Sequence, residues 1–201
     1  MNRVEIYIFR HGETDWNRER RLQGHTDIPL NETGRSQARE LAKKVQALQP
    51  ELILSSDLSR ALETATIVNS LLQVPMHLSE SLRECRMGEP EGMLRDEVLA
   101  LYGQDAWDRW ISVKESDQDF VFKNGESKRD HLMRMTGYIE GFLQGNPNLK
   151  RIAISTHGAS LRRLAHHCEG APKEGISLPN CALYKLTFNL HSKQWSFESP
   201  L

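Results

Sequence analysis

The chain has 201 residues, of which 26 are basic and 27 acidic, so its formal net charge at pH 7 is −1. This length suits one domain, or one domain with a cap, and is sufficient for a hydrophobic core. Hydrophobic residues make up 38% of the chain and charged residues 26%, with only 8 Pro and 13 Gly, which argues against a disordered or fibrous protein. Non-specific binding to nucleic acid or to an anionic membrane needs an excess of basic residues, so the charge balance argues against both.

The cysteines and the first residues indicate the compartment in which the protein works. Cys85, Cys168 and Cys181 are widely spaced and odd in number, a pattern typical of neither a disulfide framework nor a zinc site. Glu5 falls where a signal peptide would need apolar residues, and no apolar run reaches the roughly 18 residues of a membrane span. We therefore expect a soluble, reduced, cytoplasmic protein that needs no metal or other cofactor.

Apolar runs and amphipathic stretches alternate along the chain. Leu41, Val45 and Leu48 recur at helical spacing, and Ser55-Ser56-Asp57 offers N-cap residues for a helix that follows. The predicted elements, in chain order, are a strand at 4–9, a helix at 33–48, a strand at 52–54, a helix from 55–57 to about 71, a strand within 75–82, a helical segment at 94–115, a helix from 126 to about 143, a strand at 152–155, a helix at 159–169 and strands at 183–188 and 195–198.

This alternation predicts an α/β fold with three layers, α/β/α, around a mostly parallel central sheet. The last two strands follow each other directly, so we expect them to form an antiparallel edge. Residues from about 85 to 125 interrupt the alternation with Gly88, Pro90, Gly92 and a Trp-containing helical segment. We interpret this stretch as a helical cap inserted into a single domain of residues 1–201.

Two of the predicted strands, far apart in the sequence, each end in a His-Gly pair. These are His11-Gly12 and His157-Gly158. Ligands of open α/β sheets collect beyond the carboxyl ends of the strands, so neighbouring strands would bring the two histidines together there. Glycine lets the backbone approach a ligand closely, and the helix after Gly158 would direct its N-terminal N–H groups to the same region. The arrangement favours an anionic ligand.

Two arginines favour phosphate as that anion. Arg10 precedes His11, and Arg60 follows the strand at 52–54. Two guanidinium groups, two imidazoles and backbone N–H groups suit a tetrahedral phosphate better than a planar carboxylate. A histidine can attack phosphorus and form a phosphohistidine, but the leaving oxygen then needs an acid. Glu84 is one candidate, which the residue pattern alone does not distinguish from the other acidic residues.

A set of motifs resembles the histidine phosphatase superfamily, in the branch that contains cofactor-dependent phosphoglycerate mutases. The resemblance extends from residue 4 to about residue 164, and the motifs occur in the family's order. They are Arg10-His11-Gly12-Glu13-Thr14, Asn17, Gln23-Gly24, Asp27, Pro29-Leu30, Gly34 with Gln37-Ala38, Ser55-Ser56-Asp57-Leu58-Ser59-Arg60-Ala61 with Thr64-Ala65, Leu82-Arg83-Glu84 with Gly88 and Glu91-Gly92, Gly125-Glu126-Ser127, and Ser155-Thr156-His157-Gly158. The resemblance implies a phosphoglycerate mutase-like fold.

The resemblance also implies a role for each matching residue. His11 would be the phosphorylated nucleophile, and Glu84 would protonate the leaving oxygen and then act as base on water. The residues expected to clamp the phosphoryl oxygens are Arg10, Arg60, His157 and Asn17. The residues expected to shape the pocket around the substrate are Gly12, Thr14, Gln23, Gly24 and Gly158. Fixed cations of this kind can stabilise phosphoryl transfer without a metal.

Several other residues have simpler interpretations. Trp107 and Trp110, three residues apart, are expected to pack within the cap. Pro90 stands where related phosphatases often carry an aromatic residue, which would alter the pocket wall beside Glu84. The run of Arg18, Arg20 and Arg21 is expected to be solvated, with contact to a distal part of an anionic substrate as the alternative. Residues expected to be structural or on the surface are Arg162-Arg163, His166-His167, His25, His77, His131 and His191.

Three functions remain open, and a metal-independent phosphomonoesterase acting on a small phosphorylated metabolite is favoured. The alternative is a cofactor-dependent phosphoglycerate mutase, but the resemblance suggests that mutases carry a longer, more basic insertion before the second histidine. Residues 93–125 hold four basic and seven acidic residues, which suits a bisphosphate poorly. The third is a non-catalytic protein that binds phospho-ligands. The β-rich C-terminal edge could pair with a second copy of the chain, so a homodimer stays open.

Overall fold

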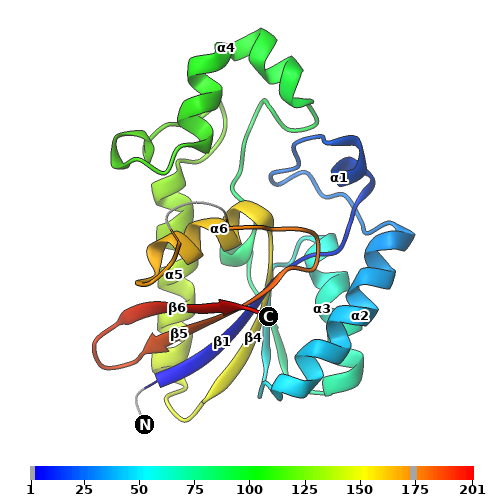
Figure 1. The fold of residues 1–201 in the computed structure, drawn as a ribbon, viewed down its shortest axis with the longest axis vertical. Coiled ribbons are helices and arrows are strands. Elements are labelled where there is room, and N and C mark those ends of the chain that lie inside the picture. The colour runs from blue at the N-terminus through cyan, green and yellow to red at the C-terminus, as the bar shows by residue number, and fades with distance from the viewer. Residues whose placement is uncertain (1–2, 173–175) are drawn as a thin grey trace.

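The computed structural model describes residues 3–172 and 176–201, and its centre is a six-stranded sheet (Figure 1). The strand order is β3-β2-β4-β1-β5-β6, in which the first four strands are parallel and the last two are antiparallel to their neighbours. The predicted mostly parallel sheet with an antiparallel edge is therefore confirmed. The strand bounds are β1 Arg3–Arg10, β2 Ile53–Ser55, β3 Met76–Leu78, β4 Arg151–Thr156, β5 Leu183–Asn189 and β6 Gln194–Pro200.

Helices cover both faces of the sheet, α2 and α3 on one side and α5 and α6 on the other (Figure 1). Alternate side chains of a strand point to opposite faces, and β1 follows this rule. Ile6 and Ile8 belong to the core beneath α5 and α6, whereas Tyr7 and Phe9 belong to the core beneath α2 and α3. The helix bounds are α2 Glu32–Leu48, α3 Ser59–Leu72, α5 Lys128–Gly145 and α6 Gly158–His167.

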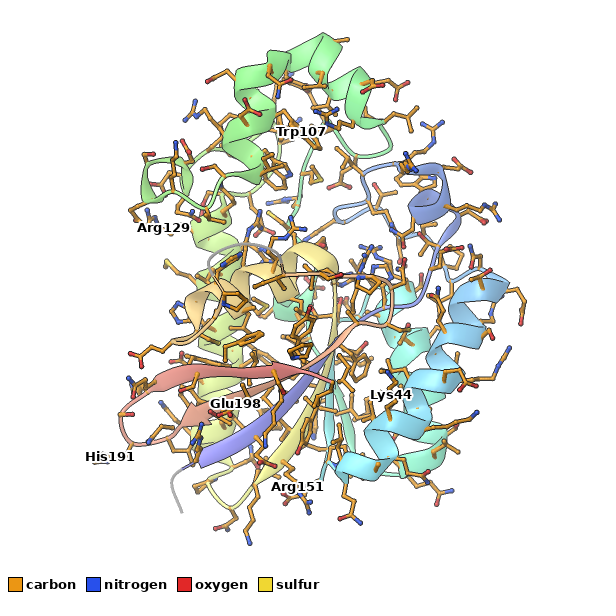
Figure 2. The ribbon with its side chains drawn as sticks, in the orientation of Figure 1. Lys44, Trp107, Arg129, Arg151, His191 and Glu198 are labelled. Atoms are coloured by element: carbon orange, nitrogen blue, oxygen red, sulfur yellow. The ribbon has the colours of Figure 1, made fainter. Side chains whose placement is uncertain are left out.

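The predicted cap stands above the carboxyl ends of the parallel strands (Figure 1). Its main element is α4 (Arg95–Ile111), which is interrupted at Gly103 by a φ of 81° and a ψ of 167°. The cap has a small core of its own, and Trp107 on α4 packs against this core (Figure 2). Trp110 is part of the same core and only 9% exposed, so the predicted cap packing of both tryptophans is confirmed.

Two elements differ from the prediction. A short helix, α1 (Asp15–Glu19), was not predicted; the Thr14 side chain caps it by accepting from the N–H of Asn17. The third strand ends at Leu78, and a 3₁₀ helix, η1 (Glu80–Leu82), occupies the rest of the predicted segment. Both are too short to produce a periodic apolar pattern, so no sequence periodicity marks them. A second 3₁₀ helix, η2 (Glu115–Asp117), follows α4.

The composition led to expectations about the cysteines and about membrane-spanning segments. Within the described ranges Cys85, Cys168 and Cys181 are free thiols, and burial raises the pKa of each to about 12. Of the helices in that part of the chain, none is both long and apolar enough to span a membrane. β6 is an edge strand of the sheet, and pairing through it with a second copy stays a prediction.

Candidate active site

Two histidines meet at the carboxyl ends of β1 and β4. These strands are adjacent and parallel, with Arg10 opposite Thr156, so the residues that follow them lie at one edge of the sheet. The ring centroids of His11 and His157 are 5.3 Å apart, and the rings form an angle of 61°. His11 is 3% exposed and His157 is fully buried. The predicted meeting of the two histidines is confirmed.

The His11 ring is held in one tautomer. Its Nδ1 lies 2.7 Å from the carbonyl oxygen of Gly12, and because a carbonyl only accepts, Nδ1 carries the hydrogen. Burial lowers the pKa of His11 well below its usual 6.5, and the charges of Arg60 and Arg10 lower it further. The imidazole is therefore neutral at neutral pH, with a lone pair on Nε2.

The His157 ring is held from its other nitrogen. Its Nε2 lies 2.9 Å from the hydroxyl oxygen of Ser56, in the segment after β2. Burial is the main cause that lowers the pKa of His157 well below 6.5, and the charge of Arg60 adds to it. The Nδ1 atom is buried and has no hydrogen-bond partner among the described residues. A buried polar atom without a partner is costly, so this nitrogen is available to a ligand.

Arg10 and Arg60 bring two positive charges to the same place without a carboxylate partner among the described residues. Arg60 is fully buried and donates to the carbonyls of Gly24 (2.8 Å) and Thr26 (3.0 Å). Arg10 donates to the carbonyl of Leu178 at 2.5 Å. Burial lowers the pKa of Arg60 to about 10, so it stays charged at neutral pH. Two cations, one buried and one partly buried, that are bound only to carbonyls form a site for an anion.

A cavity of about 250 Å³ opens onto these groups. Four of the predicted pocket residues line it, namely Asn17, Gln23, Gly24 and Gly158. His11, Arg10, Arg60 and Glu84 line it as well. His157 lies behind the lining, in contact with His11.

Gly12 and Thr14, predicted to shape the pocket, do not line it. A Cβ on Gly12 would lie 2.4 Å from the carbonyl oxygen of Gly34, so this glycine serves close packing of the loop against α2. Thr14 is buried as the N-cap of α1. A Cβ on Gly158 would lie 3.3 Å from Nε of Arg10, so the second glycine leaves room for the arginine that faces the phosphate site.

Glu84 lines the cavity, but its carboxylate is bound to the start of α6. Oε2 accepts from the N–H of Ala159 (2.9 Å), and Oε1 accepts from the N–H groups of Ser160 (3.0 Å) and Cys85 (2.9 Å). The prediction that this helix N-terminus directs its N–H groups to the phosphate needs correction, because Glu84 occupies two of them.

The comparisons with known proteins agree with this geometry. The family model of the histidine phosphatase superfamily (branch 1) matches residues 6–199. The chain belongs to this superfamily. Its relatives include a Bacillus subtilis protein named uncharacterized phosphatase PhoE, 33% identical over 91% of this chain and 88% of that protein. They also include a Cronobacter sakazakii protein named probable phosphoglycerate mutase GpmB, 32% identical over 92% of this chain and 85% of that protein.

Solved structures share the fold of this histidine phosphatase. A mycobacterial glucosyl-3-phosphoglycerate phosphatase in complex with VO3 matches with a TM-score of 0.86 and 26% identity, covering 98% of both chains. YhfR of Bacillus stearothermophilus matches with a TM-score of 0.83 and 28% identity, covering 96% of this chain and 95% of the other. The phosphoglycerate mutase-like fold predicted from the motifs is therefore confirmed.

In this histidine phosphatase a chain of hydrogen bonds leads from α6 and α5 to Glu84. Arg163 donates to Nδ1 of His131 at 2.5 Å, which places the ring hydrogen on Nε2. His131 Nε2 lies 3.0 Å from the hydroxyl of Ser160, and that hydroxyl lies 3.1 Å from Oε1 of Glu84. Each group thus donates to the next, in the direction of the carboxylate. The placement of Arg163 on the helix surface was wrong, because it is half-buried and stacks on Trp110 at 5.0 Å.

Arg134 fixes the backbone that carries Glu84. Its guanidinium donates to the carbonyls of Ser81 (2.8 Å), Arg83 (3.0 Å) and Glu84 (2.9 Å), and it forms an ion pair with Glu126 at 2.6 Å. The motif at 125–127 had marked Glu126 as part of the resemblance, but it did not indicate this partner. No spacing rule connects Arg134 with residues 81–84, so the sequence held no signal for it.

Other parts of the site also escaped the sequence analysis. Asn180 donates to Oδ1 of Asn17 (3.0 Å) and to the carbonyl of His11 (3.2 Å), and so connects the loop before β5 to His11. Of the arginine run at 18–21, Arg21 lines the cavity, whereas Arg18 pairs with Asp15. Pro90 is buried and does not line the cavity, so its expected effect on the wall beside Glu84 was wrong. The chain turns between Gly88 and Glu91, where the N–H of Glu91 donates to the carbonyl of Gly88.

The described residues hold no group of three or more histidine, cysteine or acidic side chains placed to ligate a metal. His166 lies on the flank of α6 and lines a second cavity, which is described below. His131 was expected to be structural or on the surface, and it is fully buried in the hydrogen-bond chain behind Glu84.

Proposed function

We propose that this histidine phosphatase hydrolyses small phosphomonoesters through a phosphohistidine on His11 and needs no metal. The observation that carries the proposal is a buried, neutral imidazole with a free Nε2 beside two arginines that have no acidic partner among the described residues. A phosphate dianion would supply the missing charge for both arginines. The mycobacterial phosphatase of the same fold forms a complex with VO3, which is an oxyanion of the kind that two arginines without acidic partners would bind.

In the first step the lone pair on Nε2 of His11 attacks phosphorus, and the bond between phosphorus and the alcohol oxygen breaks. Arg10 and Arg60 stabilise the charge on the transferred oxygens, and Nδ1 of His157 is placed to donate to one of them. Glu84, turned from α6 in its protonated form, gives its proton to the leaving alcohol.

In the second step Glu84, now a carboxylate, takes a proton from water, and the water oxygen attacks phosphorus. The bond between phosphorus and Nε2 breaks, which frees phosphate and restores neutral His11. The chain from Arg163 through His131 and Ser160 supports this exchange because it offers a hydrogen bond to Glu84 in the ionised form. Glu84 then returns to the N-terminus of α6.

Phosphoglycerate mutase is the second candidate, because a relative at 32% identity is named as one. A mutase returns the phosphoryl group from histidine to its substrate and needs a second site for a doubly charged intermediate. The cap of this chain carries more acidic than basic residues, which favours transfer to water.

The test is phosphate release from a panel of phosphomonoesters, including 3-phosphoglycerate, in excess EDTA. Product isomers are followed in parallel. His11→Ala is the loss-of-function variant, and His191→Ala, at an exposed turn, is its matched control. We expect release that survives EDTA, is abolished in His11→Ala and is unchanged in His191→Ala.

Three other outcomes would replace the proposal. Isomerised phosphoglycerate with little free phosphate would identify a mutase. Release that stops in EDTA would contradict metal independence. Ligand binding by folded protein with neither product would identify a non-catalytic binding protein.

A further inference from the structure

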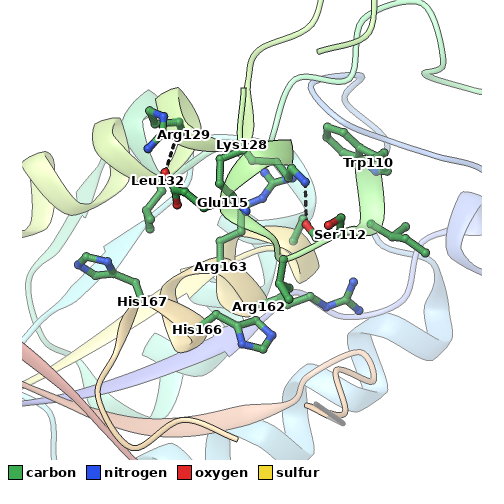
Figure 3. Close-up of a pocket in the computed structure, with 14 residues that line it drawn as sticks. Trp110, Ser112, Glu115, Lys128, Arg129, Leu132, Arg162, Arg163, His166 and His167 are labelled. Atoms are coloured by element: carbon green, nitrogen blue, oxygen red, sulfur yellow. Dashed lines mark hydrogen bonds and ion pairs between the residues drawn. The ribbon is translucent and has the colours of Figure 1, made fainter. Parts of the chain in front are cut away.

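A second cavity of about 280 Å³ lies beside the one that contains His11 (Figure 3). The two cavities share Trp110, Ala159 and Arg162 in their walls, so they are neighbours that meet at these residues. The chemistry proposed above uses only the first cavity. The second is placed to receive the part of a substrate that lies beyond the transferred phosphoryl group.

One wall of the second cavity is apolar and comes from the cap side. Trp110, Ile111 and Val113 contribute it from the end of α4, and Leu132 adds to it from α5. Ile111 is 50% exposed and Val113 is 58% exposed. Exposed apolar side chains that line a cavity are typical of a ligand site, because they gain from contact with an apolar ligand.

The opposite wall is basic and comes from α6. Arg162 and His166 are four residues apart, so they lie on one face of the helix, and both residues line the cavity (Figure 3). Burial lowers the pKa of His166, and the charge of Arg162 lowers it further. Arg162 also contributes, after burial, to the lowered pKa of Arg10. Its positive charge therefore acts on both cavities.

Most other cations of this wall already have partners. Lys128 donates to the carbonyls of Arg109 (2.7 Å) and Ser112 (2.6 Å), and Arg129 pairs with Glu115 at 2.7 Å. Arg163 is committed to His131. Arg162, in contrast, forms no hydrogen bond or ion pair with any described residue. Its guanidinium is the group in this wall that is free to bind an anion.

We propose that the second cavity binds the alcohol portion of the substrate, and that this portion combines an apolar body with a second anionic group that Arg162 binds. The substrate class is thus a phosphomonoester that carries a carboxylate or a second phosphoryl group. The inference rests on the proposed phosphatase function. It also qualifies the argument from the acidic cap, because the basic wall comes from α6 and not from the inserted segment.

A pair of matched substrates tests the proposal. 4-Carboxyphenyl phosphate and 4-carbamoylphenyl phosphate differ in one charge and little in shape, and the 3-substituted pair covers the other geometry. We expect the wild-type protein to favour the carboxylates in kcat/KM by about tenfold, as a charge-assisted pair with arginine implies. Arg162→Gln should bring this ratio close to one, whereas Arg162→Lys should retain part of it. Arg39→Gln, on the exposed face of α2, is the matched control and should leave the ratio unchanged.

Binding to His11→Ala protein, measured by calorimetry with the same two ligands, gives a readout without turnover. A preference for the carboxylate that depends on Arg162, together with a wild-type protein that hydrolyses neither substrate, would support the cavity and contradict the proposed function. Equal use of both substrates by the wild-type protein would overturn the anion site. An equal loss on both substrates in Arg162→Gln would also overturn it, since Arg162 would then act on the transferred phosphoryl group. A competition experiment separates the two anion types. Displacement of 4-carboxyphenyl phosphate by a ligand with two phosphoryl groups would show that the site also binds a second phosphoryl group.

Discussion

The two ends of the active site are built differently. At the phosphate end, made by Arg10, His11, Arg60 and His157, three of the four side chains are almost fully buried and each is held by a carbonyl or a hydroxyl. The alcohol end is made by Trp110, Ile111 and Val113 on the cap side and by Arg162 on α6; it is mostly exposed, and Arg162 has no partner among the described residues. Burial and hydrogen bonding of the side chains are thus concentrated at the phosphate end.

This difference follows from what each end has to recognise. Every phosphomonoester presents the same phosphoryl group, so an anion site fixed by the two strand ends serves all of them. The alcohol differs between substrates. The alcohol end comes from α4 and α6, whose exposed side chains can change without disturbing the sheet. Substitutions at the two ends are therefore expected to differ in whether their effect depends on the alcohol.

The largest effect is expected at the phosphate end. Arg60→Gln removes a buried charge that stabilises the transferred oxygens, so kcat/KM should fall by about 10³-fold for every phosphomonoester. The fall should be the same for alkyl and aryl esters, in contrast to Arg162→Gln. Steady-state kinetics with both ester types measure this, with Arg39→Gln as control and circular dichroism to confirm folding. A fall below tenfold, or one confined to some alcohols, would contradict the assignment.

The buried histidines make stability depend on pH. His11, His131 and His157 each have a pKa lowered well below 6.5 by burial, so they stay neutral in the folded protein while the unfolded chain takes up protons below about pH 6.5. Their contribution is complete above that pH and is lost as the pH falls. Between about pH 7.5 and pH 5.5 the free energy of unfolding should drop by about 4 kcal/mol for the three.

Urea unfolding at the two pH values measures this drop. His131→Gln should reduce it by about one third, since one of the three groups no longer titrates. A free energy of unfolding that does not change with pH would mean that these histidines take up protons in the folded state as readily as in the unfolded chain. That result would contradict the lowered pKa values that burial gives them.

The hydrogen-bond chain behind Glu84 should matter less than the phosphate end. Ser160→Ala breaks it between His131 and Glu84, and loss of one hydrogen bond to a carboxylate should lower kcat for alkyl phosphates by about tenfold. Aryl esters such as p-nitrophenyl phosphate should lose less, because their leaving oxygen needs less protonation. The pH profile of kcat should shift as well. Ser70→Ala, at an exposed position on α3, is the control, and a uniform loss on both ester types would indicate a merely structural role.

Sequence patterns predicted the phosphate end because its residues lie in short segments at strand ends. The alternating apolar residues of β1 marked the strand, and parallel strands bring their carboxyl ends together, so His11 and His157 could be placed as neighbours. The close packing of Gly12 against Gly34 was not predicted, because no sequence pattern connects these two residues. What a residue packs against becomes visible only in the folded chain.

Several contacts around the site and in the cap could not be predicted from sequence patterns for a related reason. Arg10 binds the carbonyl of Leu178, and any residue could supply a carbonyl, so residue identity carries no signal there. Arg163 and His131 meet because α5 and α6 pack side by side, and their separation of 32 positions matches no local period. Within the cap, Gly103 ends the helical dihedrals in the middle of a segment that the sequence predicted as one helix.

The smallest effect is expected from that glycine. Gly103 has a φ of 81° and a ψ of 167°, a conformation nearly restricted to glycine, so Gly103→Ala should lower the free energy of unfolding by about 1 kcal/mol. An added Cβ would meet no atom within 4 Å, which assigns the cost to the backbone alone. Gly137→Ala is the matched control, since it lies exposed within α5 and its Cβ also meets nothing, yet its dihedrals are helical. It should raise the free energy of unfolding by about 0.5–1 kcal/mol. Changes of opposite sign in the free energy of unfolding, with p-nitrophenyl phosphate hydrolysis retained in both variants, would show that the cap conformation can change while the phosphate end keeps its geometry. A loss of hydrolysis in Gly103→Ala would show instead that the two ends depend on each other.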